Sequence, residues 1–183
     1  MIKLSLLAAA ALLTASSAMA QDAAPEPVHD DFAPPPIVMS TEHPDEEAVE
    51  PYARSNANAG ATPFEGRAMF DAFHGQAGID RIVDDMVARN VADPRISPIF
   101  AASDLVRLRR TLKEQFCFIL GGDCAYSGMA MAASHADLGL QPSDMGALVE
   151  NLQLAMGAEG VPFAVQNRFL AKLAPMKRDV VTR

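Results

Sequence analysis

The sequence contains few of the residues that build metal sites and covalent cofactor sites: two cysteines and four histidines among 183 residues. Cys117 and Cys124 do not form a Cys-x-x-Cys-His pattern, which excludes covalent attachment of a c-type haem. A structural zinc site needs four ligands, and besides these cysteines the folded part offers only His74 and His135. The sequence therefore argues against a zinc-stabilised fold.

Several enzyme motifs are also absent from the sequence. It has no glycine-rich phosphate loop followed by Lys-Ser/Thr, no His-Glu-x-x-His and no Gly-x-Ser-x-Gly. We therefore exclude the phosphate-loop nucleotide hydrolases, the zinc proteases with this helix motif and the common serine hydrolases.

Long apolar runs are missing too. The run from Leu4 to Leu13 is too short for a permanent membrane span. Residues 1–20 nevertheless have the pattern of a signal peptide: Lys3 precedes the apolar run, and Ala18-Met19-Ala20 ends it. No cysteine follows for lipid attachment. We expect an exported, periplasmic protein without stable membrane insertion; a retained membrane anchor is the alternative.

Residues 21–62 are rich in proline and acidic residues. They hold seven of the 13 prolines and nine Asp or Glu residues against one basic residue, Arg54. Such a composition predicts a disordered acidic linker. Residues 63–183 carry a net charge of only −1, which argues against nucleic acid or an anionic membrane as their partner.

The remaining residues, 63–183, have the length of one domain, and their apolar periodicity is helical throughout. We find no convincing strand, so the predicted fold class is all-α. Asp104 is a good N-cap, and Gly121-Gly122 a good C-terminal stop, for the second predicted helix. Pro175 bends or divides the last helix. The helices are expected at residues 79–91, 104–120, 128–137, 142–156 and 162–173.

The two cysteines have a simple use in an exported protein. On one continuous helix their Cα atoms would lie roughly 10 Å apart, beyond disulfide reach. Because Gly121-Gly122 ends the helix between them, the chain can turn back and bring Cys124 to Cys117. We predict a disulfide between them; two separate buried thiols are the alternative.

His135 follows a run of small residues, and it shares one helical face with Met131 and Leu138. On residue statistics alone, a lone histidine in this position is more often packed or capping than a ligand. A neutral imidazole is nonetheless a common iron ligand, and one axial histidine suffices for a b-type haem. The residues alone leave both interpretations open.

Four segments of the chain carry a family resemblance. The most specific is Tyr126-x-Gly128-x-x-Met131-x-x-x-His135 with a following leucine; the others are DDMVARNVADPRISPIF, LRRTLKEQFCFILGG and GVPFAVQNRFLAKLAPMKRDVV. In their order and spacing, residues 69–181 resemble the group I truncated haemoglobins, which are shortened globins with a two-over-two helical sandwich. The resemblance implies a truncated globin domain at residues 63–183 and haem b, iron protoporphyrin IX, as its cofactor.

The resemblance also implies roles for single residues. It makes His135 the proximal ligand of the haem iron, and it packs Phe100 on the haem. Gly121-Gly122 falls at the hinge before the proximal segment. The other residues expected around the haem are Val87, Leu108, Thr111, Leu112, Phe116, Met131 and Leu140.

On the distal side the sequence departs from the family pattern. Members often carry Phe-Tyr in the second helix and Gln, His or Lys on the distal helix. Here the corresponding residues are Met86-Val87, and Leu108, Thr111 and Leu112. Thr111 is the one small donor expected near a ligand. An unusually apolar distal pocket predicts weak oxygen retention relative to NO or CO.

Three functions remain open. The leading one is a haem globin that reversibly binds a diatomic gas (O2, NO or CO). The second is a haem enzyme, an NO dioxygenase or a peroxidase-like protein, which would need a separate electron donor. The third is a helical interaction module without haem. Four basic residues of the distal helix are candidates to bind the haem carboxylates: Arg107, Arg109, Arg110 and Lys113. We expect one or two of them to do so, and a solvated basic face is the alternative for each.

Overall fold

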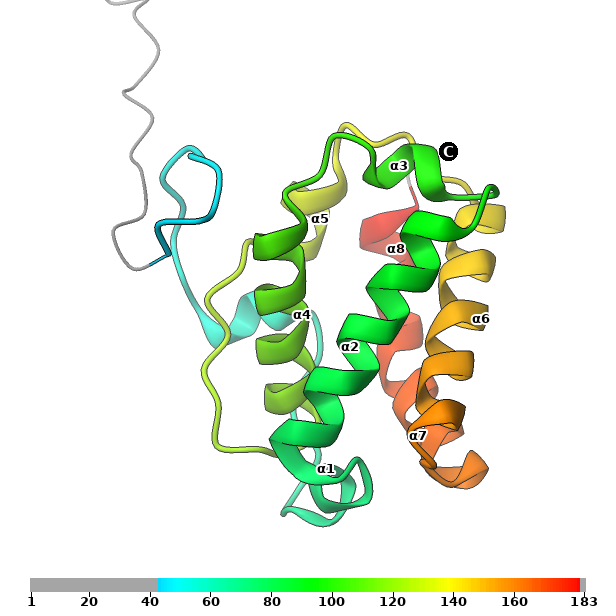
Figure 1. The fold of residues 1–183 in the computed structure, drawn as a ribbon. Helices are drawn as coiled ribbons and strands as arrows, with labels where there is room; N and C mark the ends of the chain where they lie inside the picture. Colours follow the sequence, from blue (N-terminus) through cyan, green and yellow to red (C-terminus); the bar gives the residue numbers. More distant parts are fainter. Residues whose placement is uncertain (1–42, 182–183) are drawn as a thin grey trace, which may run out of the picture. The chain divides into compact units, whose positions relative to one another are not determined.

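The computed structural model describes residues 43–181, and the regular elements in this range are helices (Figure 1). The expected leader, residues 1–20, and the first part of the expected linker, residues 21–42, lie outside the described residues. No helix in residues 43–181 is long and apolar enough to cross a membrane. In chain order the elements are η1 (Asn56–Ala59), α1 (Ala68–Ala72), α2 (Gly75–Ala92), α3 (Ser97–Phe100), α4 (Leu105–Ile119), α5 (Met131–His135), α6 (Pro142–Ala158), α7 (Phe163–Leu173), η2 (Ala174–Met176) and α8 (Lys177–Val180).

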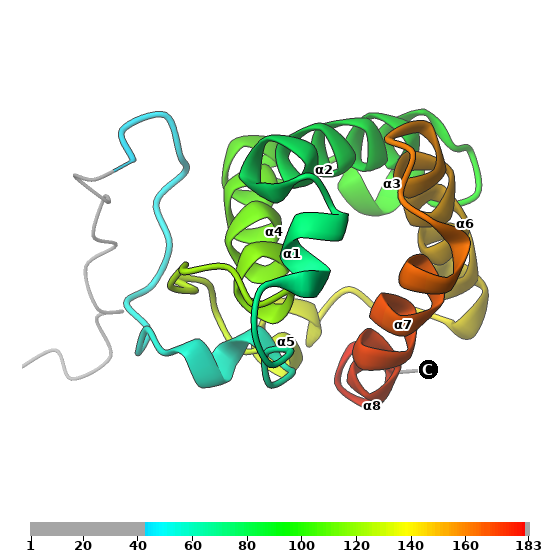
Figure 2. The ribbon, with the colours of Figure 1, turned by 90° about the horizontal axis from the view of Figure 1, so that it is seen from below.

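The long helices form two pairs. Helix α2 packs against α4 on one side and against α6 on the other, and α6 packs against α7. The view from below shows α2 running between α4 on one side and α6 on the other, with α7 next to α6 (Figure 2). The short helices α5 and α8 contact each other. This arrangement is the two-over-two sandwich that the sequence predicted.

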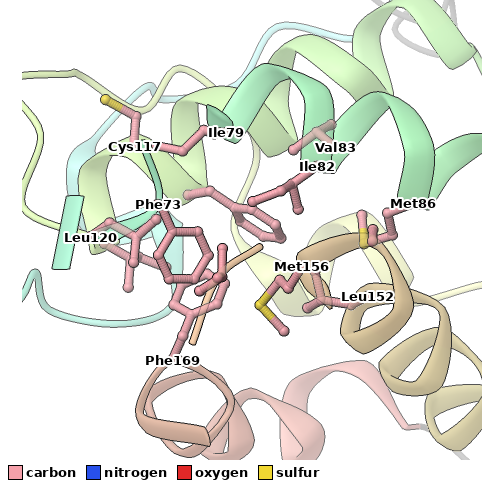
Figure 3. Packing of buried hydrophobic residues seen from close by; sticks show 14 of the residues in the cluster. Phe73, Ile79, Ile82, Val83, Met86, Cys117, Leu120, Leu152, Met156 and Phe169 are labelled. Carbon is pink, nitrogen blue, oxygen red and sulfur yellow. The ribbon is translucent and has the colours of Figure 1, made fainter. Parts of the chain in front are cut away.

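Three phenylalanines join the helix pairs in the core. The ring of Phe169, on α7, meets the rings of Phe73 and Phe116 edge to face, at centroid distances of 5.1 and 5.0 Å. Phe73 and Phe169 are fully buried among aliphatic side chains of α2 and α6 (Figure 3). Burial of each ring removes a large apolar area from water, and the edge-to-face geometry adds roughly 1 kcal/mol per pair.

The corner between α1 and α2 has an unusual backbone. His74 and Gly75 both have left-handed φ angles, 61° and 65°, and His74 is the only non-glycine residue of the described range with a positive φ. Its Nδ1 lies 2.9 Å from Oε1 of Glu159, whose carboxylate also accepts from Nε of Arg81 at 2.9 Å. The strained corner is thereby tied to the C-terminal end of α6.

The predicted signals of the second helix are present in α4. The carboxylate of Asp104 accepts from the backbone N–H groups of Val106 and Arg107, each at 3.0 Å. Gly121 follows the helix with φ 84°, a conformation that suits glycine. The capping residues therefore define this helix as the sequence predicted.

Helix α5 is shorter than the predicted helix at residues 128–137. Residues 123–130, which precede Met131, are not helical, and Ala130 is extended at φ −61°, ψ 146°. Side chains from other parts of the chain hold the backbone groups of residues 126–128, so these groups are not free to form a helix. We call residues 120–130 the α4–α5 loop.

Residues 43–62, which we call the N-terminal segment, differ from the expected disordered linker. The segment packs on α4 and the α4–α5 loop, and it contains two buried residues, Glu46 and Ala59. Glu46 is only 5 % exposed because Arg107 and Arg110 of α4 bind its carboxylate. Prolines and acidic residues here thus belong to a segment paired with a basic helix face.

Candidate functional site

A cavity of about 690 Å³ lies among α2, α4, α5, α6 and α7. Its walls are mostly leucine, isoleucine, methionine and phenylalanine side chains, with few polar groups among them. Ligand and cofactor sites usually have this character and a volume of roughly 300–1,000 Å³. The cavity is therefore the candidate site of the protein.

His135, the last residue of α5, lines this cavity and is half-buried. Its Nδ1 lies 2.7 Å from the carbonyl oxygen of Met131, four residues earlier. Because a carbonyl can only accept, Nδ1 carries the hydrogen and donates it. The other ring nitrogen, Nε2, then keeps its lone pair and can bind a metal ion.

Eight of the nine residues expected around the haem line the cavity. Val87 does not: it is fully buried in the core, and its neighbour Met86, about 100° further round α2, reaches the cavity instead. The structure thus places Met86, and not the expected Val87, at the cavity wall. The eight that line the cavity are Phe100, Leu108, Thr111, Leu112, Phe116, Met131, His135 and Leu140.

The hydroxyl groups along the cavity are all engaged with the backbone. Thr111 Oγ1, expected as a donor to a ligand, instead donates to the carbonyl oxygen of Arg107 at 2.9 Å. Tyr126 Oη donates to Met129 O at 3.2 Å, and burial raises the pKa of this phenol to about 12. The serines do the same: Ser103 Oγ donates to Ile99 O at 3.4 Å and Ser134 Oγ to Ala130 O at 3.1 Å. No hydroxyl hydrogen is left to point into the cavity from the residues described.

Two buried amides also line the cavity, and both have partners. Asn90 Oδ1 accepts from Asn151 Nδ2 at 3.0 Å. Gln115 Nε2 donates to the carbonyl oxygen of Ala59 at 2.8 Å, and it lies 3.4 Å from the sulfur of Met131. These amides link elements of the fold, and Gln115 links α4 to the N-terminal segment.

Residues 68–182 match the family model described as bacterial-like globin. The chain belongs to this family. A curated group 1 truncated haemoglobin of Nostoc sp. (strain MUN 8820) is 30% identical over 115 residues, which are 63% of this chain and 98% of that protein. The protein of the same description from Nostoc commune is 29% identical over 115 residues, again 63% and 98% of the two chains. These relatives make the chain a truncated globin of group I.

Solved structures of truncated globins share the fold. The Fe(III) form of truncated haemoglobin from Tetrahymena pyriformis superposes with a TM-score of 0.61 at 23% identity, covering 63% of this chain and 98% of that one. The 2/2 haemoglobin from Synechococcus sp. PCC 7002, in the cyanomet state with covalently attached haem, gives a TM-score of 0.59 at 24% identity, with 63% and 98% covered. As a truncated globin, the chain has a haem cofactor and a function related to diatomic gases.

The four basic residues named as candidates for the haem carboxylates lie outside the cavity lining of this globin. Each has an acidic partner, and none lines the cavity: Arg107 pairs with Glu46, Arg110 with Glu46 and Glu114, and Arg109 and Lys113 with Asp84. Within residues 43–181, the cation that lines the cavity is Lys177, which is exposed at the start of α8.

Cys117 and Cys124 form a disulfide, with their Cα atoms 5.9 Å apart. Cys117 is fully buried at the end of α4, and the bridge ties it to the α4–α5 loop. The turn at Gly121-Gly122 brings the two residues together, as the sequence predicted. Within residues 43–181, no group of three or more His, Cys, Asp or Glu side chains forms a metal-ion site.

Sequence reasoning missed many of the cavity residues, and three of these have polar groups that matter for the site: Gln115, Tyr126 and Lys177. Gln115 lies on α4 next to Phe116 and one turn after Leu112, and all three side chains line the cavity. Tyr126 is the first residue of the motif that ends at His135, and its place in this motif was the available signal. Lys177 follows a proline-containing turn, η2, and no local pattern indicates that this turn brings it to the cavity.

Proposed function

We propose that this truncated globin holds haem b non-covalently, with Nε2 of His135 as the proximal ligand of the iron, and reversibly binds a diatomic gas. The observation that carries the proposal is the hydrogen bond from Nδ1 of His135 to Met131 O at 2.7 Å. Second-shell bonds of this kind fix the ring orientation and raise the basicity of a metal-ligating histidine. When bound, the haem iron supplies the coordination position for the gas.

The residues of the cavity fit a haem group. Met131, Phe116 and Leu112 give apolar walls on the two helices expected to enclose the macrocycle, α4 and α5. Lys177 offers a cation for a carboxylate side chain of the cofactor. The absence of a Cys-x-x-Cys-His motif supports non-covalent binding.

The cavity favours gases that do not depend on a hydrogen-bond donor. Dioxygen gains more from a nearby donor than carbon monoxide does, and a donor is worth about 1 kcal/mol. The hydroxyls of Ser103, Thr111, Tyr126 and Ser134 all donate to backbone carbonyls. We therefore propose weak retention of oxygen, with NO or CO bound relatively more strongly.

We also propose that the protein works outside the cytoplasm, in the periplasm. The leader-like pattern of residues 1–20 supports this, and so does the disulfide between Cys117 and Cys124, because disulfides persist in oxidising compartments. Detection of the mature chain in a periplasmic extract, beginning at residue 21, is the expected result.

The absorption spectrum of the purified protein tests the haem proposal. We expect a Soret band, with all haem extracted by acidified solvent, and loss of this band in His135→Ala. The matched control is His74→Ala, because His74 lies at the α1–α2 corner and does not line the cavity. A Soret band that survives in His135→Ala would assign the iron to another ligand.

A further inference from the structure

The α4–α5 loop carries the chain from the end of α4 to the helix that bears His135. Backbone groups of three consecutive loop residues are bonded by side chains of the N-terminal segment. Tyr126 N donates to Asn56 Oδ1 at 2.8 Å, and Ser127 O accepts from Tyr52 Oη at 3.0 Å. Gly128 O accepts from Asn58 Nδ2 at 3.2 Å. The N-terminal segment thus supplies this loop with the hydrogen-bond partners that a neighbouring strand or helix would otherwise supply.

Asn56 and Asn58 are themselves held in place. They belong to η1, whose N-cap Ser55 accepts from Ala57 N at 3.2 Å. Asn58 Nδ2 also donates to Ala53 O at 2.8 Å. A side chain with fixed neighbours loses little entropy when it bonds the loop, so these bonds restrict the loop effectively.

The same loop is bonded by α4. Ser127 N donates to Glu114 Oε2 at 2.9 Å, and Arg110 bonds both Glu114 and Ser127. Arg110 also donates from Nη2 to Glu46 Oε2 at 2.9 Å. The almost fully buried Glu46 carboxylate therefore connects the start of the N-terminal segment to the side chains that hold the loop.

The end of the N-terminal segment touches the cavity wall itself. Ala59 O accepts from Gln115, which lines the cavity. A Cβ at Gly60 would lie 2.8 Å from Cγ of Met131 and 3.0 Å from Sδ of Met176. Met131 is the residue whose carbonyl orients His135, so this contact reaches the proximal helix directly.

We propose that the N-terminal segment, residues 43–62, is a positioning element for the haem: it fixes residues 126–128 and Met131 and thereby sets the place and orientation of His135. The inference rests on the proposed function of His135. The positioning residues are Asn56, Asn58 and Tyr52, which act through the loop and do not line the cavity. Without the hydrogen bonds of these residues, α5 would no longer be held at a defined distance from the opposite wall of the cavity.

The first test uses Asn56→Leu in the otherwise unchanged chain, loaded with haem. We measure the rate of haem transfer to an excess of an apoglobin acceptor and the iron–histidine stretching band by resonance Raman spectroscopy of the ferrous protein. Loss of one hydrogen bond to a buried group predicts roughly three- to tenfold faster haem loss. We also expect the iron–histidine band to shift or broaden.

Two matched variants separate positioning from general stability. Asn56→Asp keeps an oxygen acceptor for Tyr126 N and should restore both readouts. Ile82→Val removes a methyl group from the fully buried core at a residue outside the cavity wall. Ile82→Val should lower the unfolding temperature but leave the iron–histidine band unchanged. If Asn56 had a purely structural role, Asn56→Leu would show the same combination.

The outcomes distinguish the two proposals. A parent protein without a Soret band, or a band that survives in His135→Ala, overturns the proposed function. A normal Soret band in Asn56→Leu, with the haem-loss rate and Raman band of the parent, overturns only the positioning role. Should Asn56→Leu not fold, Tyr52→Phe decides by the same two readouts, because it removes one hydroxyl and nothing else.

Discussion

His135 Nδ1 lies 2.7 Å from the carbonyl oxygen of Met131, one turn earlier in α5. The side chain of the same Met131 packs against Gly60 at the end of the N-terminal segment. The group that orients the imidazole therefore belongs to a residue held from outside the globin helices. Changes in the N-terminal segment and changes at His135 are expected to affect the same spectroscopic properties.

Thr111→Val should leave oxygen dissociation nearly unchanged. The two side chains have the same shape, and the threonine hydroxyl donates to Arg107 O at 2.9 Å, so it is not available to a ligand. Stopped-flow measurement of oxygen release from the ferrous protein checks this. Release that becomes tenfold faster in the valine variant would mean that the hydroxyl turns toward the ligand.

Leu112→Gln should slow oxygen dissociation, by about tenfold. Leu112 lines the cavity on α4, and a glutamine there adds a hydrogen-bond donor in place of an apolar side chain. One net hydrogen bond of about 1.4 kcal/mol, near the upper end of the usual range, corresponds to a change of this size. Leu112→Met is the control, because it preserves volume without a donor; carbon monoxide release should change little in both variants.

The helical part of this fold could be predicted from sequence because the signals are local. Asp104 and Gly121 mark the ends of α4, and the apolar period places its buried face. The eight expected residues that line the cavity follow from the same periodicity together with the family motif. Met86 and Val87 are both buried on α2 and differ by about 100° in direction, so apolar periodicity alone does not tell which of them faces the cavity.

The role of the N-terminal segment could not be predicted in this way. Its prolines and acidic residues have the composition of a linker, and that composition argued for disorder. Glu46 holds the segment on α4, and its partners Arg107 and Arg110 lie 61 and 64 residues further along the chain. A pairing over such a separation leaves no pattern in a single sequence.

Cys124→Ser should destabilise the protein by about 2.5 kcal/mol, the loop-entropy value for a bridge across seven residues. Urea unfolding under non-reducing conditions measures the difference. Reduced parent protein should unfold at the urea concentration of the variant. A variant as stable as the oxidised parent would mean that the α4–α5 loop is equally ordered without the bridge.

In Glu159→Gln, the free energy of unfolding should fall less between pH 4.5 and pH 2 than it does in the parent. The hydrogen bond from Arg81, and then that from His74, lower the pKa of the Glu159 carboxyl from 4.5 to about 2. A carboxyl with a lowered pKa in the folded state stabilises the fold fully above its unfolded value. It loses this contribution as the pH falls from about 4.5 towards 2.

We measure the free energy of unfolding of Glu159→Gln and of the parent from pH 7 to pH 3. At pH 7 the value for the variant should be lower than that for the parent. The difference should shrink as the pH falls. Asp71→Asn is a control, since the paired carboxylate of Asp71 is 65 % exposed and its ion pair with Arg67 spans 3.9 Å. A constant difference at all pH values would show that Glu159 stabilises the fold independently of its charge.

Gly60→Ala should destabilise the haem-loaded protein more than Gly66→Ala does. Both glycines have left-handed φ angles, 80° and 67°, so alanine meets similar backbone strain of about 1 kcal/mol at each. The surroundings differ: at Gly60 a Cβ would lie 2.8 Å from Met131 Cγ, whereas at Gly66 nothing lies within 4 Å. The difference between the two variants therefore isolates the contact with Met131.

We expect this difference to be roughly 1 kcal/mol, at the lower end of overpacking costs, because methionine side chains can move. A displaced Met131 would also move the carbonyl that holds His135, so Gly60→Ala should alter the iron–histidine band and Gly66→Ala should not. Thermal unfolding and resonance Raman spectra of the two proteins provide both comparisons. Equal stability and identical bands in the two variants would mean that Met131 yields to the new methyl group without disturbing His135.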